Sequence, residues 1–202
     1  MKKIIALMLV LGCIFACASC QWIPGSNDNT PDDSASIPDI QAKIDASAPA
    51  GADITVTFKT ALGDLNGSYD VLYNEDGTAT VAYSYEKFNT FTEDAASTEL
   101  KSTVEGIVTV AADGKVSGDL GTEGLTAVSF DLKLDENKLS SVVINAGVLN
   151  ATVKAENTEA VLGVALSYDA QLVVVTGSNG VTSMTVSYTT TLGNVEIVTL
   201  YK

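Results

Sequence analysis

Residues 53–59 read DITVTFK, and this stretch decides the fold class because apolar and polar side chains alternate at every step. In an extended chain Ile54, Val56 and Phe58 fall on one side, and the residues between them fall on the other. A period of two is typical of a β-strand that buries one face and leaves the other in water. The stretch therefore predicts a half-buried strand.

The same alternation returns in segment after segment up to the C-terminus, with turn signals between the segments. Two strong signals are Asp64-Leu65-Asn66-Gly67 and Asn74-Glu75-Asp76-Gly77, since glycine tolerates the positive φ that a tight turn needs. Further signals lie at residues 112–115, 135–138 and 177–180. About ten strands joined mostly by tight turns predict an all-β, mainly antiparallel meander. The pattern leaves open whether the strands form one curved sheet, as in a half-barrel, or a sandwich.

Three segments are apolar on both faces: residues 106–110, 142–144 and 172–175. A sheet covered on one side only would alternate throughout, so we expect another sheet, a lid or a ligand to cover the second face of these strands. Residues 128–134 alternate on a single face and predict one more strand.

A short helix is predicted before the sheet. Ser36 or Asp39 can cap it, and Ile37, Ile40 and Ile44 fall on one of its faces. All four prolines of the chain come before residue 50, so the rest of the chain is free to form unbroken strands.

The amino-terminal residues predict an exported protein. Lys2 and Lys3 form a basic start and residues 4–10 begin an apolar run, which together are typical of a secretory signal. The end of this region, Cys17-Ala18-Ser19-Cys20, resembles a bacterial lipoprotein signal, in which small residues precede the Cys that is acylated and becomes the new N-terminus. The resemblance implies lipidation at Cys20, with Cys17 as the alternative. An ordinary signal peptide, cleaved without lipidation, is the other interpretation.

This interpretation divides the chain into a signal peptide over residues 1–19, the lipidated Cys with a flexible linker over residues 20–36, and a β domain over residues 37–202. The linker consists largely of Pro, Gly, Ser, Asn and Asp, a composition that cannot bury a core. Two acyl chains on Cys20 would hold the protein stably on a membrane. We therefore expect a lipid-anchored protein of the cell envelope, on the extracytoplasmic side.

An N-terminal helix, a long antiparallel meander from Ile54 to Tyr201 and two Ala- and Glu-containing insertions, at residues 92–101 and 156–163, resemble the LolA/LolB-like half-barrel lipoproteins. The resemblance implies a curved sheet closed by lid helices around an apolar cavity for acyl chains. The chain departs from that pattern because its insertions are short and polar and because it has no Arg.

Composition excludes several classes of function. The chain of 202 residues has 25 Asp and Glu against 11 Lys, a net charge of −14, with no Arg and no His. Such a charge repels phosphate backbones, so nucleic acid is not an expected partner. All three Cys lie at or before residue 20, which leaves the predicted β domain without disulfides or thiol chemistry.

The sequence contains no catalytic constellation. Without His there is no ordinary Ser-His-Asp triad, no imidazole base and no His-containing zinc site. Ser84 and Lys87 match a Ser-x-x-Lys pattern, but penicillin-recognising enzymes carry it together with two further motifs, and here it lies in a predicted strand. We therefore expect no enzyme activity, no cofactor and no metal site.

The doubly apolar strands and the aromatic side chains favour a binding or carrier module for lipid or another hydrophobic ligand. We expect six residues to line its pocket: Phe58, Tyr83, Tyr85, Phe130, Leu132 and Tyr188. Each of them would serve equally well in an ordinary core. The alternative is a structural or adhesive envelope protein, in which Ser- and Thr-rich strand faces such as Thr189-Thr190-Thr191 bind another protein.

Overall fold

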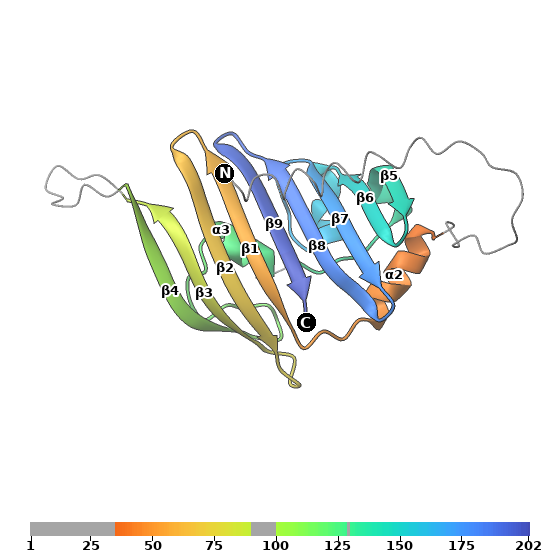
Figure 1. Ribbon diagram of the computed structural model, residues 1–202, viewed down its shortest axis with the longest axis horizontal. Coiled ribbons are helices and arrows are strands. Elements are labelled where there is room, and N and C mark those ends of the chain that lie inside the picture. The colour runs from red at the N-terminus through yellow and green to blue at the C-terminus, as the bar shows by residue number, and fades with distance from the viewer. Residues whose placement is uncertain (1–34, 90–99, 129) are drawn as a thin grey trace, which may run out of the picture. The chain divides into compact units, whose positions relative to one another are not determined.

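The computed structural model describes residues 35–89, 100–128 and 130–202, and these form one open antiparallel sheet with a few short helices (Figure 1). The sequence analysis left a curved sheet and a sandwich open, and the structure shows a single sheet. It confirms the all-β meander. The strands are β1 (Gly51–Thr60), β2 (Gly63–Tyr73), β3 (Ala79–Phe88), β4 (Lys101–Val110), β5 (Leu139–Asn145), β6 (Val148–Val153), β7 (Ala170–Gly177), β8 (Gly180–Thr189) and β9 (Gly193–Tyr201). The helices are α2 (Ile37–Ala46), α3 (Thr122–Val128) and α4 (Thr158–Leu162), with 3₁₀ turns at Glu136–Lys138 and Ala155–Asn157.

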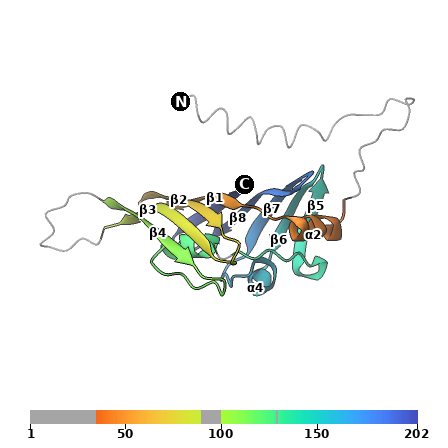
Figure 2. The same cartoon turned by 90° about the horizontal axis from the view of Figure 1, so that it is seen from below.

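The chain builds the sheet in two runs that meet in the middle. The strand order is β4-β3-β2-β1-β9-β8-β7-β6-β5, and every neighbouring pair is antiparallel. Strands β1 to β4 proceed outward to one edge, residues 111–138 cross to the opposite edge, and β5 to β9 return to pair with β1. The crossing segment contains α3, which Figure 1 shows behind the sheet. Viewed from below, α3 and α4 lie on the same side of the sheet (Figure 2).

We call the face under α3 the inner face and the opposite one the outer face. The inner face is apolar, and Ile54 and Val56 are at most 4 % exposed. Two clusters form its core. The first contains side chains of strands β1, β2, β3, β4 and β9 and of helix α3. The second contains side chains of strands β6, β7 and β8 and of helices α2 and α4. Phe130, Tyr188 and Tyr201 pack against both clusters and connect them.

Helix α2 begins as the sequence predicts. The Asp39 backbone N–H donates to the Ser36 hydroxyl at 3.4 Å, and the Ser36 N–H donates to the Asp39 carboxylate at 2.8 Å. This capping box satisfies N–H groups that the first turn of a helix leaves without partners. Ile40 is buried in the second cluster and Ile44 packs at its margin, which confirms the predicted apolar face.

One predicted turn is wrong. Asp64-Leu65-Asn66-Gly67 lies inside β2, and the chain reverses earlier, at residues 61–62. The pairing gives the reason, because Phe58 faces Leu65 in an unbroken register and so places Leu65 on the inner face. The turns predicted at residues 74–77, 112–115 and 177–180 are confirmed, and residues 135–138 form a 3₁₀ turn.

The predicted strand at residues 128–134 is not formed by the residues that the structure describes there: Val128 ends α3, and residues 130–134 are irregular. The backbone N–H groups of Asp131 and Lys133 donate to carbonyl oxygens of α4, at 2.9 Å and 2.8 Å. An alternating pattern shows only that one side of a segment is buried. Here the buried side packs on the inner face and not in a ladder of strands.

Of the two predicted insertions, residues 156–163 form α4 with a 3₁₀ turn before it, as expected. The insertion at residues 92–101 falls almost wholly outside the described residues, and only its end belongs to β4. None of the helices in the described part of the chain combines the length and the apolar character needed to cross a membrane.

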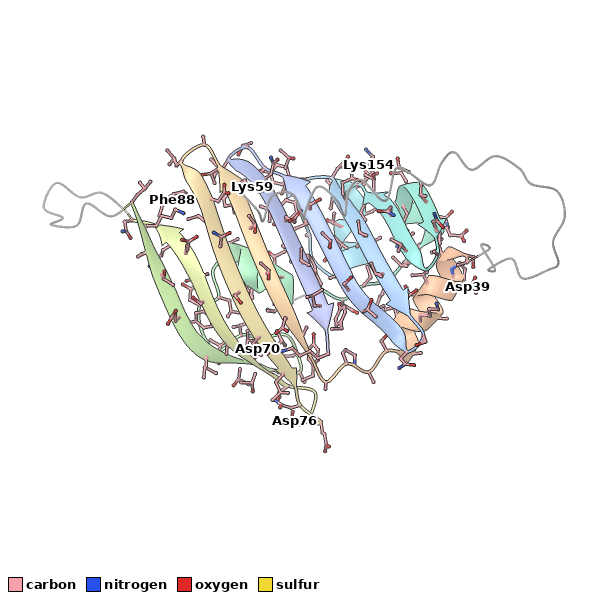
Figure 3. All side chains as sticks on the ribbon, in the orientation of Figure 1. Asp39, Lys59, Asp70, Asp76, Phe88 and Lys154 are labelled. Carbon is pink, nitrogen blue, oxygen red and sulfur yellow. The ribbon has the colours of Figure 1, made fainter. Side chains whose placement is uncertain are left out.

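The outer face is mostly polar, and Figure 3 looks onto it. One row across the strands, read from β4 to β5, consists of Glu105, Ser84, Ser68, Thr55, Val198, Thr185, Val173, Asn150 and Val143. We expected a cover over the second face of the doubly apolar strands, and in two of them no described residue provides it. Ile107 on β4 is 73 % exposed and Val143 on β5 is 59 % exposed.

Candidate ligand-binding hollows

The inner face is hollowed beside the hairpin that joins β1 and β2. A space of about 350 Å³ opens there between β1 to β3 and the segment that leads into α3. We call it the β1–β3 hollow. Its lining comes from β1 (Val56, Phe58), β2 (Leu65, Asn66, Gly67, Tyr69), β3 (Tyr85, Glu86, Lys87, Phe88) and the segment before and at the start of α3 (Asp119, Gly121, Thr122). Figure 3 shows Phe88 at the end of β3.

Tyr69 fixes the segment that closes this hollow. Its side chain is 2 % exposed, and its hydroxyl donates to the backbone carbonyl oxygen of Leu120 at 3.1 Å. The ring lies against two glycines. A Cβ atom at Gly67 would come within 2.8 Å of the ring, and one at Gly124 in α3 would overlap it. Glycine is therefore needed at both positions for β2 and α3 to approach each other this closely.

Tyr85 lines the β3 wall of the hollow, and Tyr83 stacks on it with ring centroids 5.8 Å apart. Burial, followed by the charge of Asp119 and a hydrogen bond to it, raises the pKa of the Tyr85 hydroxyl. The proton of this hydroxyl is shared with the Asp119 carboxylate. Tyr83 in turn covers Gly106, its cross-strand partner on β4, where a Cβ atom would lie 2.6 Å from the Tyr83 hydroxyl.

The rim of the hollow carries charged groups. The backbone N–H and the side-chain amide of Asn66 donate to the Glu86 carboxylate at 2.8 Å and 2.9 Å, and Lys101 lies 3.7 Å from the same carboxylate. These hydrogen bonds, the backbone one first, lower the pKa of Glu86. Lys87 is exposed and forms no ion pair with any described residue. An amphipathic ligand would find apolar walls inside and a cation at the rim.

A second space, of about 250 Å³, lies toward the other end of the inner face, between α2, residues 130–133, the start of β8 and the end of β9. We call it the α2 hollow. Phe130, Leu132 and Tyr201 line it. Burial raises the pKa of Tyr201 to about 12, so this hydroxyl is neutral throughout the physiological range.

A third space, of about 460 Å³, is lined largely by outer-face side chains of β1, β9, β8 and β7. Its lining includes Thr57, Gln171 and Glu196. Within the described part of the chain, no three His, Cys, Asp or Glu side chains gather in a way that could hold a metal ion.

The structure places the six predicted ligand residues on the inner face or against it: Phe58, Tyr83, Tyr85, Phe130, Leu132 and Tyr188. It does not gather them in one cavity. Phe58 and Tyr85 line the β1–β3 hollow, whereas Tyr83 stacks on Tyr85 and does not line the hollow itself. Phe130 and Leu132 line the α2 hollow. Tyr188 packs between the two core clusters and stacks on Tyr168, with ring centroids 6.4 Å apart.

Sequence reasoning missed the residues that shape the β1–β3 hollow from β2 and from the segment before α3. Leu65 and Gly67 were hidden by the turn predicted around them, although they continue the alternation that Tyr69 belongs to. That alternation is the signal that could have found them. Asp119 and Gly121 lie in a connection without any pattern, and no signal in the sequence brings them to the sheet.

The predicted lipidation site, Cys20, and the predicted signal peptide lie outside the described residues. Comparisons with models of protein families, with curated proteins and with solved structures each find no match to this chain. The resemblance to half-barrel lipoproteins stays a prediction.

Proposed function

We propose that this chain is a membrane-anchored lipoprotein of the cell envelope whose β domain binds a hydrophobic small molecule in the β1–β3 hollow. The observation that carries the proposal is the hollow itself, because Phe58, Leu65 and Tyr85 converge on a space of about 350 Å³. Small-molecule sites are concave, mostly apolar and roughly 300–1,000 Å³ in volume, with a few polar groups that orient the ligand.

The size and the charges of the hollow narrow the class of ligand. Its volume, at the lower end of that range, suits a single short acyl chain or a compact ring system rather than a whole diacyl lipid. The Lys87 ammonium group offers a positive charge at the rim. A carboxylate at one end of the ligand would pair with it, so a fatty acid is the first ligand to test.

The anchor follows from the amino-terminal pattern. Two acyl chains on Cys20 suffice for stable attachment to a bilayer. A flexible linker of the length of residues 21–36 spans roughly 20–25 Å, which keeps the β domain close to the membrane while leaving it free to turn. A hydrophobic ligand would then be exchanged with a bilayer that is always nearby.

A filling substitution tests the hollow. The full chain is titrated with a fluorescent fatty acid after delipidation, and saturable binding at one site is expected. Leu65→Trp places an indole in the hollow and should abolish the binding. Leu72→Trp, on the outer face of the same strand where Leu72 is 56 % exposed, should leave it unchanged. The proposal fails if the natural chain shows no saturable binding or if both variants lose it equally.

The outer face supports a second candidate function, a structural or adhesive envelope protein. The row that passes through Ser68, Thr55 and, beyond Val198, Thr185 presents hydroxyl groups across the middle of a face that no described residue covers. Arginine at Thr55 and Thr185 would clash with a partner seated there without touching the core. If chains with and without these arginines retain the same envelope proteins after cross-linking in cells, this candidate is excluded.

A further inference from the structure

The two edges of the sheet are built differently. In β5 the pairing register shifts between Ser140 and Val143, and Ser141 has a φ of 53°. Such an irregularity makes an edge a poor template for another strand. In β4, by contrast, the pairing with β3 is regular from Lys101 to Val110, with no shift of register.

The free backbone groups of β4 can be identified from its last residues. The Thr109 N–H donates to the Ser117 hydroxyl, and the Thr109 carbonyl oxygen accepts from the Ser117 N–H, each at 3.0 Å, so both groups of Thr109 point away from β3. In an antiparallel pair this direction alternates from residue to residue. Ile107, Glu105, Thr103 and Lys101 therefore also point their N–H and C=O groups outward. No described residue forms a hydrogen bond with these groups.

The side chains of β4 do little to block this edge. Ile107, at 73 %, is the most exposed of the large apolar side chains in the described ranges. The Ser84 hydroxyl donates to the Glu105 carboxylate at 3.1 Å, and the ion pair with Glu86 likewise holds Lys101 toward β3. A regular edge with open backbone groups and an exposed apolar residue is a surface to which another strand can add.

We propose that the free edge of β4 pairs with β4 of a second copy of this chain, antiparallel and around a two-fold axis at Thr103. In this register Thr103 faces Thr103 of the second copy. Lys101 faces Glu105 of the second copy, which places opposite charges across from each other, and the symmetry repeats this arrangement on the other side of the axis. Each pair with outward groups exchanges two hydrogen bonds, about six in all, and the two sheets become continuous.

Several registers would pair the outward N–H and C=O groups of the two β4 strands, and the side-chain charges favour the register centred on Thr103. A register centred on Glu105 would place two like charges directly opposite each other, which is unfavourable, and it would need the groups of Thr109 that are already bonded. A register centred on Val104 would set Glu105 against Thr103 and place no opposite charges directly face to face. Only the register at Thr103 sets Lys101 directly against Glu105.

The net charge of −14 opposes self-association at long range. Salt at physiological strength screens charges that are more than about 8 Å apart, so the repulsion is largely removed there while the contacts within the edge remain. The pairing is therefore expected at physiological salt and should weaken at low salt. It requires neither the ligand hollow nor the lipid anchor.

Disulfide trapping tests the register. The full chain is prepared in mild detergent with Cys13, Cys17 and Cys20 replaced by serine, and then carries a single Thr103→Cys. Oxidation at physiological salt should give a covalent dimer in a yield several-fold above that of Thr55→Cys, which lies exposed in the middle of the outer face. Equal yields from the two variants, or no dimer from Thr103→Cys, overturn the proposal.

Proline tests the backbone pairing. Thr103→Pro removes an N–H that β3 does not use, so the thermal midpoint should stay close to that of the natural chain while self-association, measured by sedimentation, is lost. Ser102→Pro removes an N–H that bonds to β3 and should lower the thermal midpoint. This result would confirm which N–H groups of β4 point toward β3 and which point away from it. A folded Thr103→Pro variant that still associates contradicts the proposal. So does a natural chain that remains a monomer at every concentration, even if its edge binds an added peptide or another protein.

Discussion

Thr60 and Thr190 occupy equivalent positions in two neighbouring hairpins. Each hydroxyl donates to the carbonyl oxygen of the glycine that ends the turn, at 2.8 Å and 3.0 Å, and accepts from the N–H of the leucine in between, at 3.1 Å in both turns. The two turns lie side by side, because Thr60 pairs with Gly193 across β1 and β9. The sequence Thr-x-Leu-Gly, at residues 60–63 and 190–193, thus builds the same turn twice.

Removing either hydroxyl should weaken the fold measurably. We expect Thr60→Ala and Thr190→Ala each to lower the free energy of unfolding by about 1 kcal/mol, the usual net contribution of such hydrogen bonds. Thr60→Ser and Thr190→Ser keep the hydroxyl and should retain most of the stability. Urea unfolding of the four variants provides the measurement. A loss of equal size in the serine variants would point to the methyl group and contradict this account.

Gly124 should not tolerate even alanine. Alanine normally stabilises the interior of a helix relative to glycine, but a Cβ atom at Gly124 would overlap the ring of Tyr69, which is 2 % exposed and cannot move aside. We expect Gly124→Ala to lower the free energy of unfolding by about 1–3 kcal/mol, the range typical of overpacked cores.

The background variant Tyr69→Ala separates the overlap from other effects. With the ring removed, Gly124→Ala should become neutral or stabilising, as helix propensity alone predicts. Thermal or urea unfolding of the two single variants and the double variant gives the coupling free energy between positions 124 and 69. If Gly124→Ala lowers the free energy of unfolding by the same amount with and without the Tyr69 ring, overlap with that ring is not the cause of the loss.

The sheet itself was predictable from the sequence because alternation depends only on which face of a strand is buried. The error at residues 64–67 shows the limit of that reasoning. Asn-Gly is a strong local turn signal, but the pairing of Phe58 with Leu65 across β1 and β2 overrides it. The real turn at residues 61–62 carries only the weaker Thr-x-Leu-Gly pattern, whose meaning appears once Thr60 and Gly63 are seen to bond to each other.

The candidate site was predictable only in part. The aromatic candidates Phe58 and Tyr85 were identified because they alternate along their strands and are large. The closing segment was not identified, because the contact of Tyr69 with Leu120 depends on where the chain crosses the sheet. That crossing follows from the strand order, in which β4 and β5 are opposite edges. No local pattern encodes an order of this kind.

Stability should fall in alkali because of Tyr201. Burial raises its pKa from 10.0 to about 12 in the folded protein. The folded state therefore holds the phenolic proton more tightly than the unfolded state, so this contribution is complete below pH 10 and is lost as the pH rises toward 12. The loss across this window should amount to about 2–3 kcal/mol, given roughly 1.4 kcal/mol per pKa unit.

Urea unfolding across that window measures the loss, and Tyr201→Phe is the matched control. Phenylalanine cannot ionise, so the unfolding free energy of this variant should decline less steeply between pH 10 and pH 12. Burial also raises the pKa values of Tyr73 and Tyr85, and these leave a residual slope of the same sign. If the natural chain and Tyr201→Phe decline in parallel, Tyr201 does not cause the alkaline loss.

In acid, the capping box of α2 should respond to pH through Asp39. The Ser36 hydroxyl, then the Ser36 N–H, lower the pKa of Asp39 from 3.8. A carboxyl whose pKa is lowered on folding contributes stability above its unfolded pKa and loses it as the pH falls through its folded pKa. Ser36→Ala should cost about 1 kcal/mol near neutral pH, as loss of an N-cap usually does. Asp39→Asn should remove the dependence of α2 on acid.

Hydrogen exchange of the α2 amides at a series of acidic pH values, corrected for the intrinsic exchange rate, separates these effects from global unfolding. In the natural chain, protection of the first turn should decrease as the pH falls below 3.8, before the β-strands lose protection. In Asp39→Asn, protection of that turn should be lower at neutral pH and constant through the same range. If the first turn and the strands of the natural chain lose protection together, α2 does not unfold by itself. The carboxylate of Asp39 would then stabilise the whole sheet through the packing of Ile40 and not merely the start of a helix.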